Sequence, residues 1–92
     1  MTARDLSPMA QYLIWAMEGR GVMTNELIYR AVQRECLKHG RQLPGEWEAE
    51  IRQTLQAHCP SCPQWNGKDD FFVHHERGRW SCKVTSTTLD QL

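Results

Sequence analysis

The chain has 92 residues, which gives room for one modest hydrophobic core and no second one. Hydrophobic residues make up 40% of it and charged residues 24%, the ordinary composition of a globular chain. The 11 Lys and Arg residues balance the 11 Asp and Glu residues, so the formal net charge is zero. A neutral chain lacks the cationic excess that supports strong non-specific binding to nucleic acid. We expect one domain over residues 1–92, with its core between about residues 7 and 85 and short loose ends.

Two further features of the sequence indicate the cellular compartment of the protein. No apolar run approaches the roughly 20 residues that span a bilayer, and the first residues lack the pattern of a signal peptide. We therefore expect a cytoplasmic protein without a membrane partner. In that compartment its four cysteines are expected to be reduced thiols. They are Cys36, Cys59, Cys62 and Cys82.

A first helix is predicted from Pro8 to about Glu18. Ser7 can accept a hydrogen bond from an unpaired backbone N–H, and proline is tolerated at the first helical position. Gly19 and Gly21 end the helix, because glycine is the usual residue just past a helix end. The short extended stretch 21–23 is expected to pair with a later hairpin as a third strand.

A second helix is predicted from Asn25 to about His39. Thr24 is its expected cap, and Met23 and Ile28 have the spacing of a hydrophobic staple. The residues expected to face inward are Leu27, Ile28, Ala31, Val32 and Cys36. Basic residues at Arg30, Arg34 and Lys38 recur every fourth position and form a stripe, with Arg41 just beyond.

A third helix, predicted over residues 44–58, has two unlike faces. The apolar stripe at helical spacing consists of Trp47, Ile51, Leu55 and His58. The opposite side carries Arg52, Gln53 and Gln56. Arg and Gln can make bidentate contacts with base edges in a major groove, although the same pattern is typical of an ordinary solvated face. The first turn holds Glu46, Glu48 and Glu50, which suit the helix dipole and would repel phosphate.

A polar link and a hairpin complete the chain. Pro60 and Pro63 prevent the third helix from continuing, and Asn66-Gly67 is a strong turn signal. Residues 71–75 and 80–84 alternate as strands do, and Arg77-Gly78 lies in the turn between them. An amphipathic helix with an Arg/Gln front, followed by a hairpin with a basic tip, indicates an α+β winged helix-turn-helix. We expect three helices with a small antiparallel β-hairpin as the wing.

The stretch from Ile51 to Trp80 carries a more specific pattern. It consists of Arg52-x-x-Leu55-x-x-His58, Ser61-x-Pro63-x-Trp65-x-Gly67, Phe71 or Phe72, and Arg77-Gly78-x-Trp80. This pattern resembles the C-terminal winged helix of DpnI-type, methyl-adenine-directed restriction endonucleases. The resemblance implies duplex DNA as the partner, with a preference for methylated adenine. It implies no catalysis, because the nuclease of such enzymes is a separate domain. The chain departs from the pattern in lacking that domain and in placing cysteines at positions 59 and 62.

We therefore expect a non-catalytic DNA-binding protein, either a reader of modified DNA connected with restriction-modification or a bacterial or phage regulator. The residues expected to contact DNA are Arg30, Arg34, Arg52, Gln53, Gln56, Trp65, Arg77 and Arg79. Trp65 would meet the methyl group of adenine, or would instead cover the edge of the core. The competing interpretation is a protein-interaction module that keeps the fold without binding DNA. Zero net charge and the acidic start of the third helix favour this alternative.

The pair Cys59-x-x-Cys62 has the spacing of a metal knuckle. A zinc site would need further ligands such as His58, His74, His75 or Cys82, and no second Cys-x-x-Cys is present. We therefore expect no metal and no cofactor. A thioredoxin-like role is disfavoured because such motifs use a helix N-terminus to lower the thiol pKa, whereas this pair follows a helix C-terminus. No catalytic constellation stands out, so we expect no enzyme.

Overall fold

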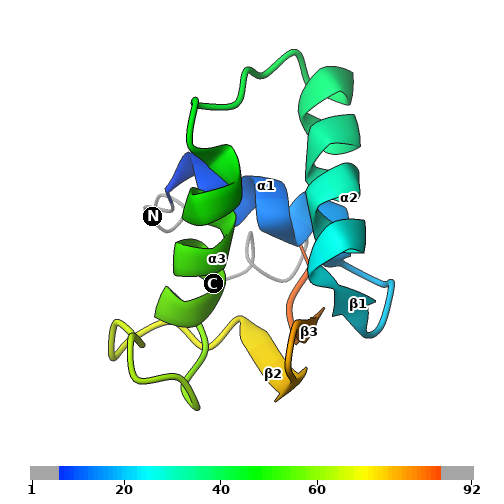
Figure 1. Ribbon diagram of the computed structural model, residues 1–92. Helices are drawn as coiled ribbons and strands as arrows, with labels where there is room; N and C mark the ends of the chain where they lie inside the picture. Colours follow the sequence, from blue (N-terminus) through cyan, green and yellow to red (C-terminus); the bar gives the residue numbers. More distant parts are fainter. Residues whose placement is uncertain (1–6, 86–92) are drawn as a thin grey trace, which may run out of the picture.

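The computed structural model describes residues 7–85, which form three helices and three strands (Figure 1). The helices are α1 at Pro8–Met17, α2 at Asn25–Lys38 and α3 at Trp47–Ala57. The strands are β1 at Met23–Thr24, β2 at Phe72–Glu76 and β3 at Arg79–Cys82. The predicted loose ends, 1–6 and 86–92, lie outside the described residues. Among the helices of the described range, none has the length and apolar character needed to cross a membrane.

The three strands form one antiparallel sheet in the order β1-β3-β2. Met23 of β1 and His74 of β2 both pair with Trp80 of β3, from opposite sides. In Figure 1, α2 and α3 stand on either side, α1 crosses behind them, and the hairpin closes the lower end. This arrangement confirms the predicted α+β fold, a winged helix-turn-helix in which β1 is the third strand.

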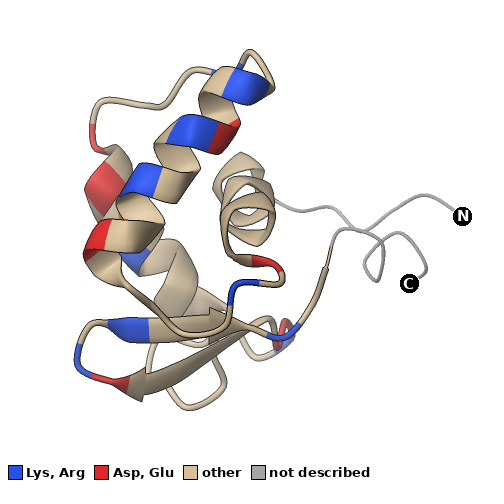
Figure 2. Ribbon diagram, turned by 90° about the vertical axis from the view of Figure 1, so that its right-hand side faces the viewer, with Lys and Arg blue, Asp and Glu red and all other residues tan. Residues whose placement is uncertain are grey.

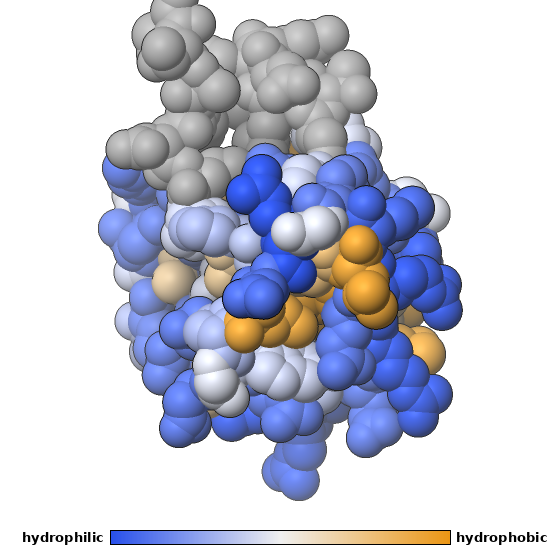
Figure 3. All heavy atoms as spheres, turned by 90° about the horizontal axis from the view of Figure 1, so that it is seen from above, coloured by the Kyte–Doolittle hydropathy of each residue, from blue (hydrophilic) through white to orange (hydrophobic). Residues whose placement is uncertain are grey.

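The core lies between the helices and the inner face of the sheet. Ile51 and Leu55 are fully buried, as the apolar stripe of α3 predicted, together with Leu13, Val32 and Phe71. The visible part of the face seen from above is mostly hydrophilic around a central group of apolar residues (Figure 3). The apolar side chains of the amphipathic helices are therefore largely removed from water, which is the main favourable contribution to folding.

The helix boundaries differ from the predicted ones at several points. α3 begins at Trp47 and not near Pro44; its N-cap, Glu46, makes no capping hydrogen bond through its side chain. Trp47 itself is only half-buried, because it lies in the first turn at the edge of the core. At the start of α2 the prediction is confirmed, since the Thr24 hydroxyl accepts from the Leu27 N–H at 3.3 Å.

The inward face of α2 is also partly different from the prediction. Leu27 is half-exposed, because one helical residue is a rotation of about 100° away from the buried Ile28. The same inner face instead takes in Glu35, whose carboxylate lies 3.6 Å from Lys38 Nζ and 3.7 Å from His39 Nε2. The long acidic side chain is tolerated because cationic or ionisable groups of the last helical turn lie beside it.

Replacing Leu55 with Ala should lower the free energy of unfolding by about 2–5 kcal/mol, because the substitution leaves a cavity in a fully buried site. Denaturation in urea measures the change. Leu37→Ala is the matched control, since Leu37 on α2 is 81% exposed and its truncation should change the free energy by less than about 0.5 kcal/mol. Equal effects of the two substitutions would contradict the assigned packing of α3.

Candidate nucleic-acid interface

A hollow of about 350 Å³ lies between α3 and the hairpin, and we call it the α3–wing groove. Its lining residues are Asn25, Arg52, Gln56, His74, Arg77, Gly78 and Trp80. Three of the residues predicted to contact DNA therefore meet here: two from the exposed side of α3 and one from the turn of the wing. The groove is therefore lined both by hydrogen-bond donors, from Arg and Gln, and by the rings of His74 and Trp80.

The α3 side of the groove is held in place by a contact with α2. Arg52 Nη1 donates to the Tyr29 hydroxyl at 2.9 Å, and the Tyr29 ring packs edge-on against Trp47 at 5.8 Å between centroids. This contact restrains the guanidinium group of Arg52 without burying it. A guanidinium has five N–H donors, so one bond to Tyr29 leaves donors for a further partner.

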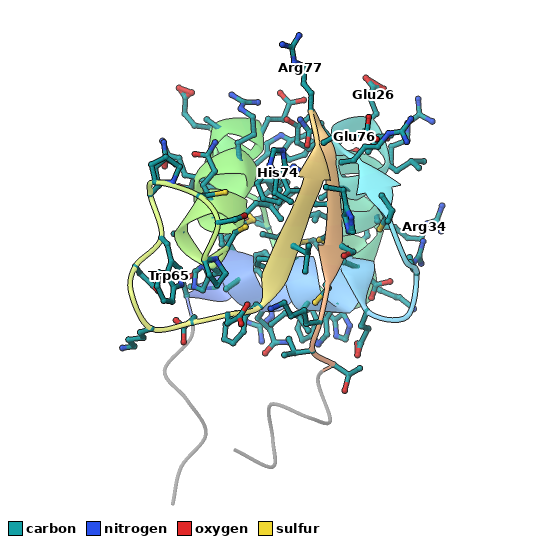
Figure 4. The ribbon with its side chains drawn as sticks, turned by 90° about the horizontal axis from the view of Figure 1, so that it is seen from below. Glu26, Arg34, Trp65, His74, Glu76 and Arg77 are labelled. Atoms are coloured by element: carbon teal, nitrogen blue, oxygen red, sulfur yellow. The ribbon has the colours of Figure 1, made fainter. Side chains whose placement is uncertain are left out.

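The wing side of the groove is anchored on the first residue of α2. The Asn25 N–H donates to the Gly78 carbonyl at 2.9 Å, and Asn25 Oδ1 accepts from Trp80 Nε1 at 3.1 Å. Gly78 has φ +69°, a conformation that other residues rarely adopt, and it allows the wing to turn tightly above Asn25. Arg77 projects from this tip, and His74 lies between the hairpin and α3 (Figure 4). The His74 ring contacts the Trp80 ring at 4.5 Å between centroids.

The far end of α3 is joined to the base of the wing through His58. Its carbonyl accepts from the N–H groups of both Phe71 and Phe72, at 3.0 and 3.2 Å, and its ring stacks on Phe71. Its Nδ1 donates to the Thr54 carbonyl at 2.8 Å, and its Nε2 lies 3.6 Å from Asp69 Oδ2. Because Phe71 precedes β2, both phenylalanines are buried, although strict alternation had placed them on opposite faces.

Five of the eight predicted DNA contacts do not line the groove, and three of these five are Gln53, Trp65 and Arg79. Gln53 lines a separate hollow of about 630 Å³ beside Pro8 and Tyr12 at the start of α1. Trp65 is 38% exposed in the link after α3, where its Nε1 donates to the Asp69 carbonyl at 2.8 Å. In Figure 4 it lies well away from the tip at Arg77. Arg79 is exposed at the start of β3.

The basic stripe of α2 lies on another face of the molecule. Arg30 and Arg34 border a hollow of about 500 Å³ that is also lined by Arg20, Val22 and Leu27, and we call this surface the α2 outer face. In Figure 4, Arg34 points away from α3. Figure 2 shows cationic segments along α2 and at the hairpin, with acidic segments on both and at the start of α3. Within residues 7–85, the cations of the α2 outer face and those of the groove therefore lie on different surfaces.

His74 was considered from sequence only as a weak metal ligand, and the structure places it in the groove. Counting back from the turn at Arg77-Gly78 pairs His75 with Trp80. A bulge between His74 and Glu76 shifts the register by one residue, so that His74 pairs with Trp80. Asn25 was also missed as a groove residue, because its contact with Trp80 joins positions 55 apart in sequence. The bulge and this contact have no local sequence signal.

The predicted metal ligands are not gathered into a site. His74 contacts Trp80, and the ring nitrogens of His58 face Thr54 and Asp69. Within the described range, no group of three or more His, Cys, Asp or Glu side chains is arranged to hold a metal ion. The free thiols of Cys59 and Cys62 lie at the C-terminal end of α3, next to the base of the wing.

Comparisons of the chain with protein-family models, with curated proteins and with solved structures give no match. The fold is therefore assigned from the order of its helices and strands and from the strand order β1-β3-β2. The functional interpretation depends on the chemistry of the groove and of the α2 outer face.

We expect the purified protein to contain no stoichiometric zinc, because a tetrahedral site needs four ligands and Cys59 and Cys62 supply two. Elemental analysis after dialysis measures this directly. One zinc per chain that disappears in Cys59→Ser would contradict the expectation and make the cysteine pair part of a metal site.

Proposed function

We propose that the protein binds duplex DNA through the α3–wing groove and performs no catalysis on it. The observation that supports this proposal is the meeting of Arg52 and Gln56 of α3 with Arg77 of the wing around one hollow. A recognition helix that enters the major groove reads base edges with such side chains, while cations beside it contact phosphate. In this proposal Gln56 reads a base, Arg77 binds backbone phosphate, and Arg52 has donors for either.

The distribution of charge on α3 indicates which part of it meets DNA. Glu46 and Glu48 are exposed in or before its first turn and would repel phosphate. Arg52 and Gln56 lie in the C-terminal half, next to the wing. We infer that this half enters the DNA groove and that the acidic first turn remains outside it. An acidic side chain would be tolerated against bases only as an acceptor from a cytosine amino group.

The resemblance to methyl-adenine-directed enzymes extends the proposal to modified DNA. A methyl group on adenine is recognised by contact with an apolar or aromatic surface. The rings that line the groove are those of His74 and Trp80, whereas Trp65 lies in the link. If the methyl group is read in the groove, His74→Ala should reduce the preference for methylated over unmethylated duplex, and Trp65→Ala should not.

Arg77→Ala should weaken binding to all duplexes, because a phosphate contact carries no sequence information. The slope of log affinity against log salt should become shallower by about one, as one fewer counterion is released. Gln56→Ala should instead cost about 1–3 kcal/mol at the preferred sequence only. Fluorescence anisotropy with methylated and unmethylated duplexes at two salt concentrations measures both effects.

Arg34→Ala is the matched control, since it removes the same charge from the α2 outer face. A larger loss for Arg77→Ala than for Arg34→Ala supports the groove. Equal losses would extend the interface to the phosphate contacts that the sequence predicted for Arg30 and Arg34. A loss for Arg34→Ala alone, or no binding to any duplex at low salt, would contradict the proposal.

A second candidate function is protein binding, and one observation favours it. On the α2 outer face, Val22 and Leu27 are 51% and 50% exposed between Arg20, Arg30 and Arg34. Exposed apolar side chains ringed by cations suit a partner segment that combines an apolar side chain with carboxylates. This candidate predicts that Leu27→Asp abolishes partner binding while leaving any DNA affinity unchanged.

A further inference from the structure

Cys59 and Cys62 lie in one tight turn directly after α3. The Cys62 N–H donates to the Cys59 carbonyl at 3.0 Å, which closes a four-residue turn. The first and last Cα atoms of such a turn are within about 7 Å. A disulfide requires a Cα separation of about 4.4–6.8 Å. The backbone therefore already holds the two cysteines close to bridging distance.

The two thiols have opposite acid–base character. Burial acts to raise the pKa of Cys59, but hydrogen bonds from Ser61, from Cys62 and from the His74 N–H together bring that pKa below the ordinary thiol value. The Ser61 hydroxyl lies 3.2 Å from Cys59 Sγ. Burial and the neighbouring Cys59 sulfur raise the pKa of Cys62 to about 11. Cys59 is thus the more acidic of the two thiols, and Cys62 the less acidic one.

The other two cysteines lack this environment. Burial raises the pKa of both Cys36 and Cys82. The Cys82 thiol donates to the Val84 carbonyl at 3.2 Å, which leaves it as a protonated donor. Cys36 is buried on the inner face of α2. These thiols serve as internal comparisons for the reactivity of the turn.

We propose that Cys59 and Cys62 form an oxidisable dithiol site whose co-reactant is a small hydroperoxide. Cys59 is 1% exposed, whereas Ser61 in the same turn is exposed and Cys62 is half-buried, so peroxide reaches the Cys59 sulfur when this turn opens locally. The Cys59 thiolate attacks one peroxide oxygen, the O–O bond breaks, and sulfenic acid and hydroxide form. The Cys62 sulfur then attacks the Cys59 sulfur, the S–O bond breaks, and the departing hydroxide takes up the Cys62 proton. Overall, two thiols become one disulfide and one peroxide becomes two waters.

The site is coupled to the wing. Cys59 Sγ accepts a hydrogen bond from the His74 N–H of β2, and His74 lines the α3–wing groove. A disulfide to Cys62 would change the chemical group that faces the His74 backbone. Oxidation should therefore weaken DNA binding, a consequence that depends on the proposed function, whereas the thiol chemistry does not.

The test is peptide mapping of the full chain after treatment with hydrogen peroxide. Trypsin releases residues 53–68 as one peptide that contains Cys59 and Cys62, while Cys36 and Cys82 fall in separate peptides. We expect peptide 53–68 to lose two hydrogen atoms and to resist iodoacetamide until it is reduced with dithiothreitol. Cys36 and Cys82 should remain alkylatable. Faster oxidation of either of these two, or an unchanged dithiol in peptide 53–68, would overturn the proposal.

Two variants separate the roles of the sulfurs. In Cys62→Ser, the sulfenic acid at Cys59 has no resolving thiol and should be trapped by dimedone. In Cys59→Ser, the Cys62 thiol should not react with dimedone after peroxide, because its raised pKa of about 11 keeps it protonated. A dimedone adduct at Cys62 in Cys59→Ser, together with no adduct at Cys59 in Cys62→Ser, would contradict the mechanism, because Cys62 would then be the sulfur that reacts with peroxide. Duplex binding measured before and after oxidation of the parent chain tests the coupling separately, since mapping needs no DNA.

Discussion

The junction at His58 determines how α3 meets the wing, and the shape of the groove depends on it. The His58 carbonyl at the end of α3 accepts hydrogen bonds from the N–H groups of Phe71 and Phe72. The residues that lead into β2 are therefore hydrogen-bonded to the end of the helix. The imidazole is buried between Phe71, the Thr54 carbonyl and Asp69, which leaves it little freedom to turn. A second anchor at Asn25 holds the tip of the wing against α2 through Gly78 and Trp80. With both ends of the hairpin fixed, Arg77 and Gln56 are kept on the two sides of one hollow.

The fold was predictable from sequence because its signals are local. Thr24 caps α2, and Ile51 and Leu55 recur at helical spacing, so caps and periodicity indicated the helices and their buried faces. The composition of the groove was less predictable. Arg52, Gln56 and Arg77 were foreseen, but Gln53 was placed with them although it lies beside α1. His74 reaches the groove through a bulge that counting along the strand does not reveal.

The distribution of charge reconciles a neutral chain with a DNA-binding proposal. The 11 cationic and 11 acidic residues cancel in sum, yet the first turn of α3 carries acids alone, while α2 and the wing carry cations with acids such as Glu35 and Glu76 among them. The field of exposed charges falls off over about a Debye length of 8–10 Å, so local groups of charge matter more for binding than the net charge of the chain. The affinity of such a protein for DNA would depend strongly on contacts within the groove, because long-range attraction is small.

The most direct test of this account is a titration of the ¹⁵N-labelled protein with a short duplex at low salt, followed by the backbone amide signals. Contact in the groove predicts shifts or broadening at Gln56, His74 and Gly78, with little change at Leu27 and Arg34 on the α2 outer face. Changes confined to Leu27, Arg34 and their neighbours, or no change at any amide, would contradict the claim that the α3–wing groove is the DNA-binding surface.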